Sequence, residues 1–189
     1  MTRQPNNSGF TLVEVIIAIS ISVILFLIIS LVFYISQNAY KKTDTRAEIT
    51  QNGRVMLDRI IRELRQAQSL ITVLPPDNSN PAALPSAIEF EDGHDVSTIT
   101  YIRYYLNGSD IQREISRYHF IEAPTTYVHS YDTNQYGDSP VKEVVEDKIV
   151  GEHVSDLEFW GNSLININLY LIKNSETITI STSIYGRNL

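Results

Sequence analysis

The residues best suited to metal chemistry lie in one polar stretch in the second half of the chain. Carboxylate and amide oxygens are the ligands that Ca²⁺ prefers, and in a calcium-binding loop they recur at alternate positions and end on a glutamate. The segment that begins at Asp132 has this pattern, although Tyr136 stands where a further oxygen ligand is expected and no helical pattern flanks it. The candidate calcium ligands are Asp132, Asn134, Asp138 and Glu143.

Other catalytic or cofactor chemistry is not indicated. The chain has no cysteine, which excludes disulfides, thiolate zinc sites and cysteine nucleophiles. The common hydrolase, zinc-protease and phosphate-binding motifs are missing, and the 4 histidines show no ligand spacing. Lys and Arg number 15 against 22 Asp and Glu, for a net charge of −7. A nucleic-acid partner is not expected, because phosphate binding requires cationic side chains. We expect a non-enzymatic protein with no cofactor beyond the candidate calcium ion.

A second unusual residue is Glu14, a carboxylate at the start of a long apolar run. From Val15 to Tyr40 no side chain carries a formal charge, and a helix of this length, roughly 39 Å, can span a bilayer. An ionisable group in such a segment is costly and usually functional. The spacing Thr11-x-x-Glu14 also fits a capping box, in which the carboxylate accepts a hydrogen bond from the Thr11 backbone N–H. Both explanations are open at this stage.

The residues before the apolar run distinguish it from a secretory signal peptide or a plain anchor. The run is long for a secretory signal, and SQNAYKK after it is a poor cleavage site. The sequence Gly9-Phe10-Thr11-Leu12-Val13-Glu14 follows a short polar leader and resembles the N-terminal signal of type IV prepilins and pseudopilins. The segment QNGRVMLDRIIRELRQA resembles the helix end of J-type pseudopilins of type II secretion and of W-type minor pilins. The resemblance is firm over residues 9–70 and loose beyond them.

This resemblance implies a processing and assembly site. In that family a membrane aspartyl peptidase cleaves after the glycine and methylates the new amino terminus. Here this implies cleavage between Gly9 and Phe10, N-methylation of Phe10, and pairing of Glu14 with an N-terminal ammonium during filament assembly. The implied partners are other pilin or pseudopilin subunits, the prepilin peptidase, the inner-membrane assembly platform and membrane lipid.

The helical pattern continues past the apolar run. Apolar residues from Ile49 to Ala67 recur at three- and four-residue spacing, which predicts one buried stripe. Gly53 and a second possible capping box, Thr45-x-x-Glu48, predict a bend or restart between residues 43 and 53. The opposite face is expected to be solvated and self-neutralised by i, i+4 pairs, namely Arg54/Asp58, Asp58/Arg62 and Arg59/Glu63.

The pattern changes after a proline-rich segment at residues 73–86, which is predicted to be a linker. Beyond it, alternating apolar and polar residues and an Asn107-Gly108 turn predict antiparallel strands. Residues 122–147 lack periodicity and are expected to form a long loop. The predicted strands are Ala87–Glu91, Ser97–Leu106, Ile111–Ile115, Asp156–Trp160, Leu164–Ile172 and Glu176–Tyr185.

Together these patterns predict an α+β fold. A long N-terminal helix, membrane-spanning in its first half and amphipathic in its second, is expected to pack on an antiparallel sheet, as the resemblance to the type IV pilin fold implies. The expected order is a leader peptide at 1–9, a transmembrane and assembly helix at 10–40, the amphipathic helix half at 41–72, the linker at 73–86 and the sheet domain at 87–189.

The expected function is that of a minor pilin or pseudopilin, cleaved after Gly9 and stored in the membrane before it joins a type IV pilus or a type II secretion pseudopilus. The chain is expected to cross the bacterial cytoplasmic membrane once, with its C-terminal domain outside the cytoplasm, and then to lie in the filament. One alternative is a DNA-uptake or adhesion module of such a filament, which a basic patch in the folded structure would favour. The other is a membrane-anchored enzyme or sensor, which an uncleaved N-terminus would favour.

Overall fold

The computed structural model describes residues 9–94 and 98–186 of the chain. It divides into two compact units, Met1–Asp44 and Thr45–Leu189. The leader predicted at 1–9 lies outside the described residues except for Gly9, as does Ser97, the predicted start of one strand. Helix α1 (Leu12–Leu64) contributes residues to both units.

Helix α1 runs without interruption through residues 43–53, so the predicted restart of the helix there is wrong. The reason lies at Gly53, which is buried. A Cβ atom there would lie 2.5 Å from Leu171 Cδ1 and 2.7 Å from Ile180 Cδ1. The glycine therefore lets the helix approach the sheet closely instead of breaking it.

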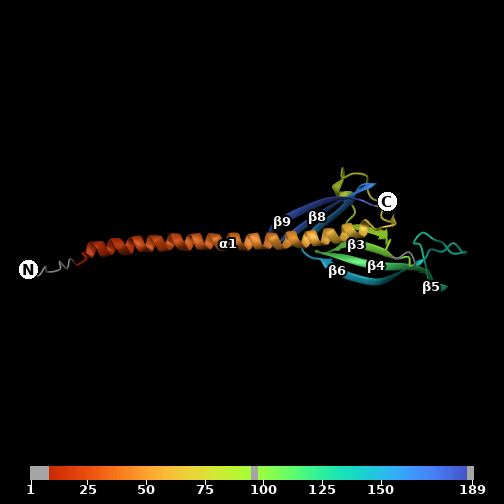
Figure 1. Cartoon of the computed structure of the whole chain (residues 1–189), viewed down its shortest axis with the longest axis horizontal. Coiled ribbons are helices and arrows are strands. Elements are labelled where there is room, and N and C mark those ends of the chain that lie inside the picture. Colours follow the sequence, from red (N-terminus) through yellow and green to blue (C-terminus); the bar gives the residue numbers. More distant parts are fainter. Residues whose placement is uncertain (1–8, 95–97, 187–189) are drawn as a thin grey trace, which may run out of the picture. The chain divides into compact units, whose positions relative to one another are not determined.

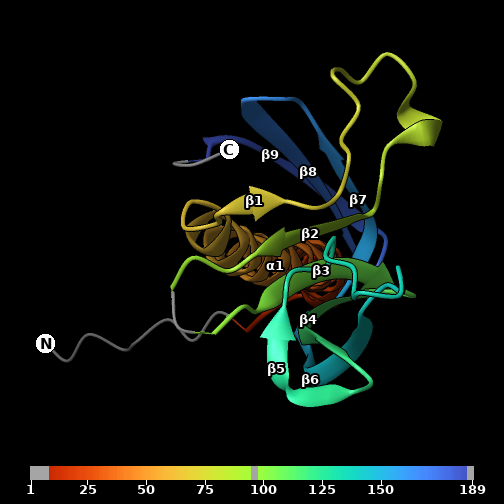
Figure 2. The ribbon, with the colours of Figure 1, turned by 90° about the vertical axis from the view of Figure 1, so that its right-hand side faces the viewer.

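The second unit contains two antiparallel sheets, where the sequence analysis expected one. The fold is nevertheless of the expected α+β class and is consistent with the type IV pilin fold. Figures 1 and 2 show α1 with β8 and β9 on one side and β3, β4 and β6 on the other. The six-stranded sheet comprises β1 (Ser69–Leu70), β2 (Ala87–Glu91), β3 (Tyr101–Asn107), β4 (Asp110–Phe120), β5 (Ala123–Val128) and β6 (Val141–Gly151). The three-stranded sheet comprises β7 (Val154–Trp160), β8 (Leu164–Lys173) and β9 (Glu176–Tyr185).

Strand β4 organises the larger sheet. Along one edge it pairs with β3 as far as Ser116 and then with β5 from Tyr118, while β6 pairs along the other edge from Ile111 to His119. The β3–β4 hairpin turns one residue later than the predicted Asn107-Gly108, because Asn107 pairs with Asp110 and the loop is Gly108-Ser109. Gly108 has φ 65°, as a glycine at the first position of a two-residue hairpin loop commonly does.

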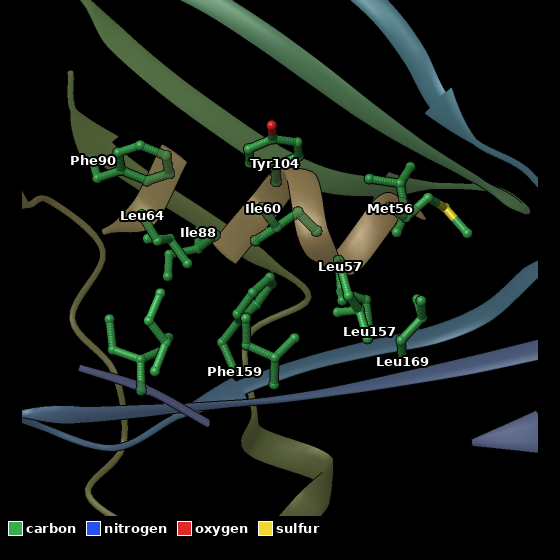
Figure 3. Packing of buried hydrophobic residues seen from close by; sticks show 14 of the residues in the cluster. Met56, Leu57, Ile60, Leu64, Ile88, Phe90, Tyr104, Leu157, Phe159 and Leu169 are labelled. Carbon is green, nitrogen blue, oxygen red and sulfur yellow. The ribbon is translucent and has the colours of Figure 1, made fainter. Parts of the chain in front are cut away.

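The hydrophobic core lies between the two sheets, around the second half of α1. Figure 3 shows Met56, Leu57, Ile60 and Leu64 of the helix between side chains from both sheets. The six-stranded sheet contributes Ile88, Phe90, Ile102 and Tyr104, and the three-stranded sheet contributes Leu157, Phe159, Ile165, Ile167, Leu169 and Leu171. The predicted alternation along β8 and the buried stripe of the helix are both confirmed.

The helix ends at Leu64, before the predicted limit at residue 72. Its last turn tightens, because the N–H groups of Gln66 and Ala67 donate to carbonyls three residues back. The Gln68 N–H then donates to the Glu91 carbonyl, and β1 pairs with β2. The chain therefore leaves the helix to become an edge strand.

The proline-rich segment 73–86 borders strand β7. It contains a 3-10 turn, η1 (Pro81–Ala83). The carbonyls of Pro75 and Pro85 accept hydrogen bonds from the N–H groups of Gly161 and Phe159. The segment is thus tied at two points to the end of β7.

Residues 122–147 are not one long loop, because they contain β5 and most of β6. The register of β6 shifts twice against β4, between Ile111 and Gln112 and between Ile115 and Ser116. Each bulge places an extra residue in the strand and breaks the two-residue alternation. Val144 and Val145 are also both exposed, so no apolar and polar faces are evident in the sequence of this strand.

Candidate functional site

The N-terminal end of α1 carries the residues for which the sequence predicts processing and assembly. Thr11 and Glu14 form a reciprocal capping box. The Thr11 backbone N–H and hydroxyl donate to Glu14 Oε2 at 2.9 and 3.0 Å, and the Glu14 N–H donates to Thr11 Oγ1 at 3.3 Å. In the single chain the carboxylate therefore accepts from the Thr11 backbone N–H and hydroxyl at the start of the helix.

The predicted cleavage site lies just before this cap and is open. Among the described residues other than its chain neighbours, no atom lies within 4 Å of the position that a Gly9 Cβ would occupy, and Phe10 is 88% exposed. Both residues precede the first helical residue, Leu12. A non-helical, uncrowded peptide that contains a residue without a side chain can enter a narrow protease cleft.

The apolar part of α1 is long and apolar enough to cross a membrane. Its large side chains are exposed from Leu12 to Ile35. Two of its few polar side chains are satisfied within the helix, since the hydroxyls of Ser20 and Ser22 donate to the carbonyls of Ile16 and Ala18 at 2.8 Å. This surface suits lipid or the apolar helices of other subunits, because neither offers hydrogen-bond partners.

The candidate calcium ligands do not converge on one point. Asp132 accepts a hydrogen bond from the His129 N–H, and Asn134 Oδ1 accepts from the N–H groups of Tyr136 and Asp138. Glu143 lies in β6, opposite Arg117 of β4. The described residues contain no group of three or more His, Cys, Asp or Glu side chains that could hold a metal ion. The loop is organised by its own hydrogen bonds.

A buried ionic cluster that the sequence analysis did not predict joins the helix to the larger sheet. Glu63 is 8% exposed, and its Oε2 accepts hydrogen bonds from Tyr104 OH at 2.7 Å and Arg113 Nε at 2.9 Å. Arg113 Nη1 also lies 3.8 Å from Glu146 Oε2. Burial and the Glu63 carboxylate raise the pKa of Tyr104 well above its ordinary value, so the phenol remains a donor.

The position of Glu63 corrects the predicted self-neutralised helix face. The predicted Arg59/Glu63 pair is confirmed, with Arg59 Nε 3.6 Å from Glu63 Oε1, but the carboxylate is buried and also binds Arg113 of the sheet. No ion pair joins Arg54 or Arg62 to Asp58 within the described part of the chain. A signal for this existed, because Glu63 lies three residues after Ile60 and four before Ala67, on the spacing of the buried stripe.

A second ionic cluster ties three strands together on the other face of the larger sheet. Lys142 Nζ of β6 lies 2.7 Å from Glu114 Oε1 of β4 and 3.0 Å from Glu89 Oε1 of β2. Burial opposes the charge on Lys142, but the two carboxylates outweigh it and hold its pKa above the ordinary value. Both clusters join separate elements of the second unit through ion pairs.

Comparison with known proteins bears on the N-terminal segment. Residues 4–30 match the family model of the prokaryotic N-terminal methylation motif. The match covers Gly9, Phe10, Glu14 and the first part of the apolar run, and it supports the resemblance to type IV prepilins. It points to a structural subunit processed at its N-terminus rather than to an enzyme. None of the curated proteins matches the chain.

Proposed function

We propose that this chain is a minor pilin or pseudopilin that is stored in the cytoplasmic membrane and then joins a type IV pilus or a type II secretion pseudopilus. The observation that carries the proposal is the N-terminal methylation motif at residues 4–30, attached to a helix that can cross a membrane. The QNGRVMLDRIIRELRQA segment supports a J-type or W-type subunit. The sheet-bearing unit lies outside the cytoplasm in this proposal.

Glu14 has two roles in succession in this proposal. In the single chain it caps the helix through Thr11, close to the membrane surface. In the filament the apolar helices exclude water, so an unpaired carboxylate would cost several kcal/mol. The methylated ammonium of Phe10, on the same or a neighbouring subunit, supplies the charge that offsets this cost. The capping box and the charge pair thus belong to different states.

The proposal is tested by separating processing from assembly. We expect the mature protein to begin at Phe10 with a methylated amine, as read by intact mass. Gly9→Leu should block cleavage and leave Met1 in place. Glu14→Val should be cleaved and inserted normally but be depleted from sheared filaments, whereas Glu14→Asp keeps the charge and should be recruited better than Glu14→Val.

Two outcomes would count against this function. A wild-type chain that retains Met1 in cells with an active prepilin peptidase would favour a membrane-anchored sensor or enzyme. Incorporation of Glu14→Val at wild-type levels would remove the charge-pairing role and leave Glu14 as a helix cap only.

A further inference from the structure

The solvent face of α1 in the second unit is a defined surface opposite the buried stripe. At about 100° per residue, six exposed residues fall within roughly a third of the helix circumference. The Arg65 N–H donates to the Ile61 carbonyl, so this residue keeps the helical position just past the end of α1. The six residues are Gln51, Arg54, Val55, Asp58, Arg62 and Arg65.

This face has a charge opposite to that of the whole chain. Arg54, Arg62 and Arg65, which we call the arginine stripe, face only one carboxylate, Asp58, whereas the chain carries −7. The next carboxylate along the helix, Glu63, is buried and pairs with Arg113 and Arg59, so it does not neutralise the stripe. Among the described residues no ion pair engages any of the three arginines. Their charge is therefore available to a partner.

A depression with both apolar and polar lining lies beside the stripe. A cavity of about 320 Å³ opens between α1 and the end of β6, lined by apolar Met56 and Val150 and by polar Gln51, Asn52 and Glu152. At its rim Val55 is 63% and Ile149 is 55% exposed. Protein interfaces commonly combine apolar contacts with polar and charged ones around them.

We infer that the arginine stripe and the adjoining cavity dock an acidic sister subunit of the same filament, one different in sequence from this chain. Carboxylates of the partner would meet Arg54 and Arg62, and an apolar side chain would enter the cavity beside Val55. The inference rests on the proposed function and deepens it by assigning a contact surface. Two copies placed stripe to stripe would oppose three arginines with three, so a symmetric self-contact is disfavoured.

The inference is tested on the full chain in its own cells. Val55→p-benzoylphenylalanine places a photo-reactive group at the rim of the cavity. After irradiation, the crosslinked partner and the site of crosslinking are identified in sheared filaments and in membranes. We expect an adduct with a second pilin-like chain, on a segment that carries carboxylates. Arg54→Glu with Arg62→Glu should lower its yield about fivefold, because each reversal replaces an attraction to the partner's carboxylates with a repulsion. Asp58→Asn should raise the yield.

The matched control is Arg46→Glu, which makes the same change of charge on the same helix. Arg46 is exposed and lies about 160° around the helix from Arg62, so its reversal should leave the adduct unchanged. A second control restores the charge complementarity. When the partner's carboxylate at the crosslinked site is replaced by arginine, the chain carrying Arg62→Glu should recover its crosslinking yield.

Each other result overturns the inference. An adduct with a second copy, with lipid or with nucleic acid would contradict the partner class, and an adduct insensitive to the double reversal would contradict the charge recognition. No adduct from a chain present in filaments would show that the surface is unused. Presence of the wild-type chain in sheared filaments tests the proposed function separately, so the two failures are distinguishable.

Discussion

The ion pair between Glu63 and Arg113 offers the most demanding test of the second unit. Glu63→Gln removes the negative charge but keeps an oxygen that can accept from Tyr104 or Arg113. Both charged side chains are largely buried, with exposed fractions of 10% and 12%. The substitution therefore leaves the largely buried Arg113 guanidinium without its nearest counter-charge. We expect a large loss in the free energy of unfolding.

The size of the expected loss of stability follows from the distances between the Arg113 guanidinium and the carboxylates of Glu63 and Glu146. At 2.9 Å from Glu63, the attraction is about 6 kcal/mol at an effective dielectric constant of ~20. Glu146, at 3.8 Å and 28% exposed, offers a screened replacement. Breaking a buried pair typically costs ~3–5 kcal/mol. Because Glu146 remains, we expect the lower end, about 3 kcal/mol, or a fall in Tm of roughly 10 °C for a domain of this size.

The assay is urea unfolding of a chain that begins at Lys41, which retains the whole second compact unit. Asp58→Asn is the control, because Asp58 is exposed and should change stability by less than about 0.5 kcal/mol. Glu63→Gln combined with Arg113→Met removes both charges and should recover to within about 1 kcal/mol of wild type. A single substitution that costs less than 1 kcal/mol, or a double substitution no better than the single, would refute the reasoning.

Three further predictions concern the same unit. Leu64→Asp buries an unpaired carboxylate at a fully buried position and should abolish the strand signal in circular dichroism, whereas Leu64→Met should stay folded. Gly161→Ala puts a Cβ at φ 117° and 1.9 Å from the Leu164 carbonyl oxygen, and should cost at least about 3 kcal/mol in urea unfolding. Gly137→Ala, with φ 85° and open space, should cost only about 1 kcal/mol. The raised pKa of Lys142 predicts a stabilisation present below its ordinary value of 10.5 and lost as pH rises through the folded-state pKa, a step that Lys142→Met should remove.

The sequence predicts best those elements that have one buried face and one face that is more exposed. The stripe from Ile49 to Ala67 and the alternation along β8 each follow from a face that is wholly buried beside a face that is not. The β3–β4 hairpin was predictable from local turn chemistry because of Gly108, although its loop is Gly108-Ser109 and not Asn107-Gly108. The capping box was likewise visible, because Thr11 and Glu14 interact within one turn.

The missed elements depend on contacts between residues far apart in the chain. Strand β6 pairs through two bulges and buries no regular face, so no periodicity marks it. The separation into two sheets is decided by how β7 follows β6, which no local pattern encodes. Of the pairs predicted on the charged helix face, Arg59 and Glu63 do pair, but Glu63 also binds Arg113, which is 50 residues away. The i, i+4 spacing predicts only the local partner.

The ion pair between Glu48 and Lys173 joins residues 125 positions apart. The ribosome makes the helix first and the strands that cover one side of it, β8 and β9, last. During synthesis the buried stripe of α1 therefore has no complete cover until β9 has been made, and contacts of such large separation form slowly. In this interval the nascent chain presents an amphipathic helix with an open apolar side, so its exposure to chaperones and proteases is set by the time needed to deliver its final strand.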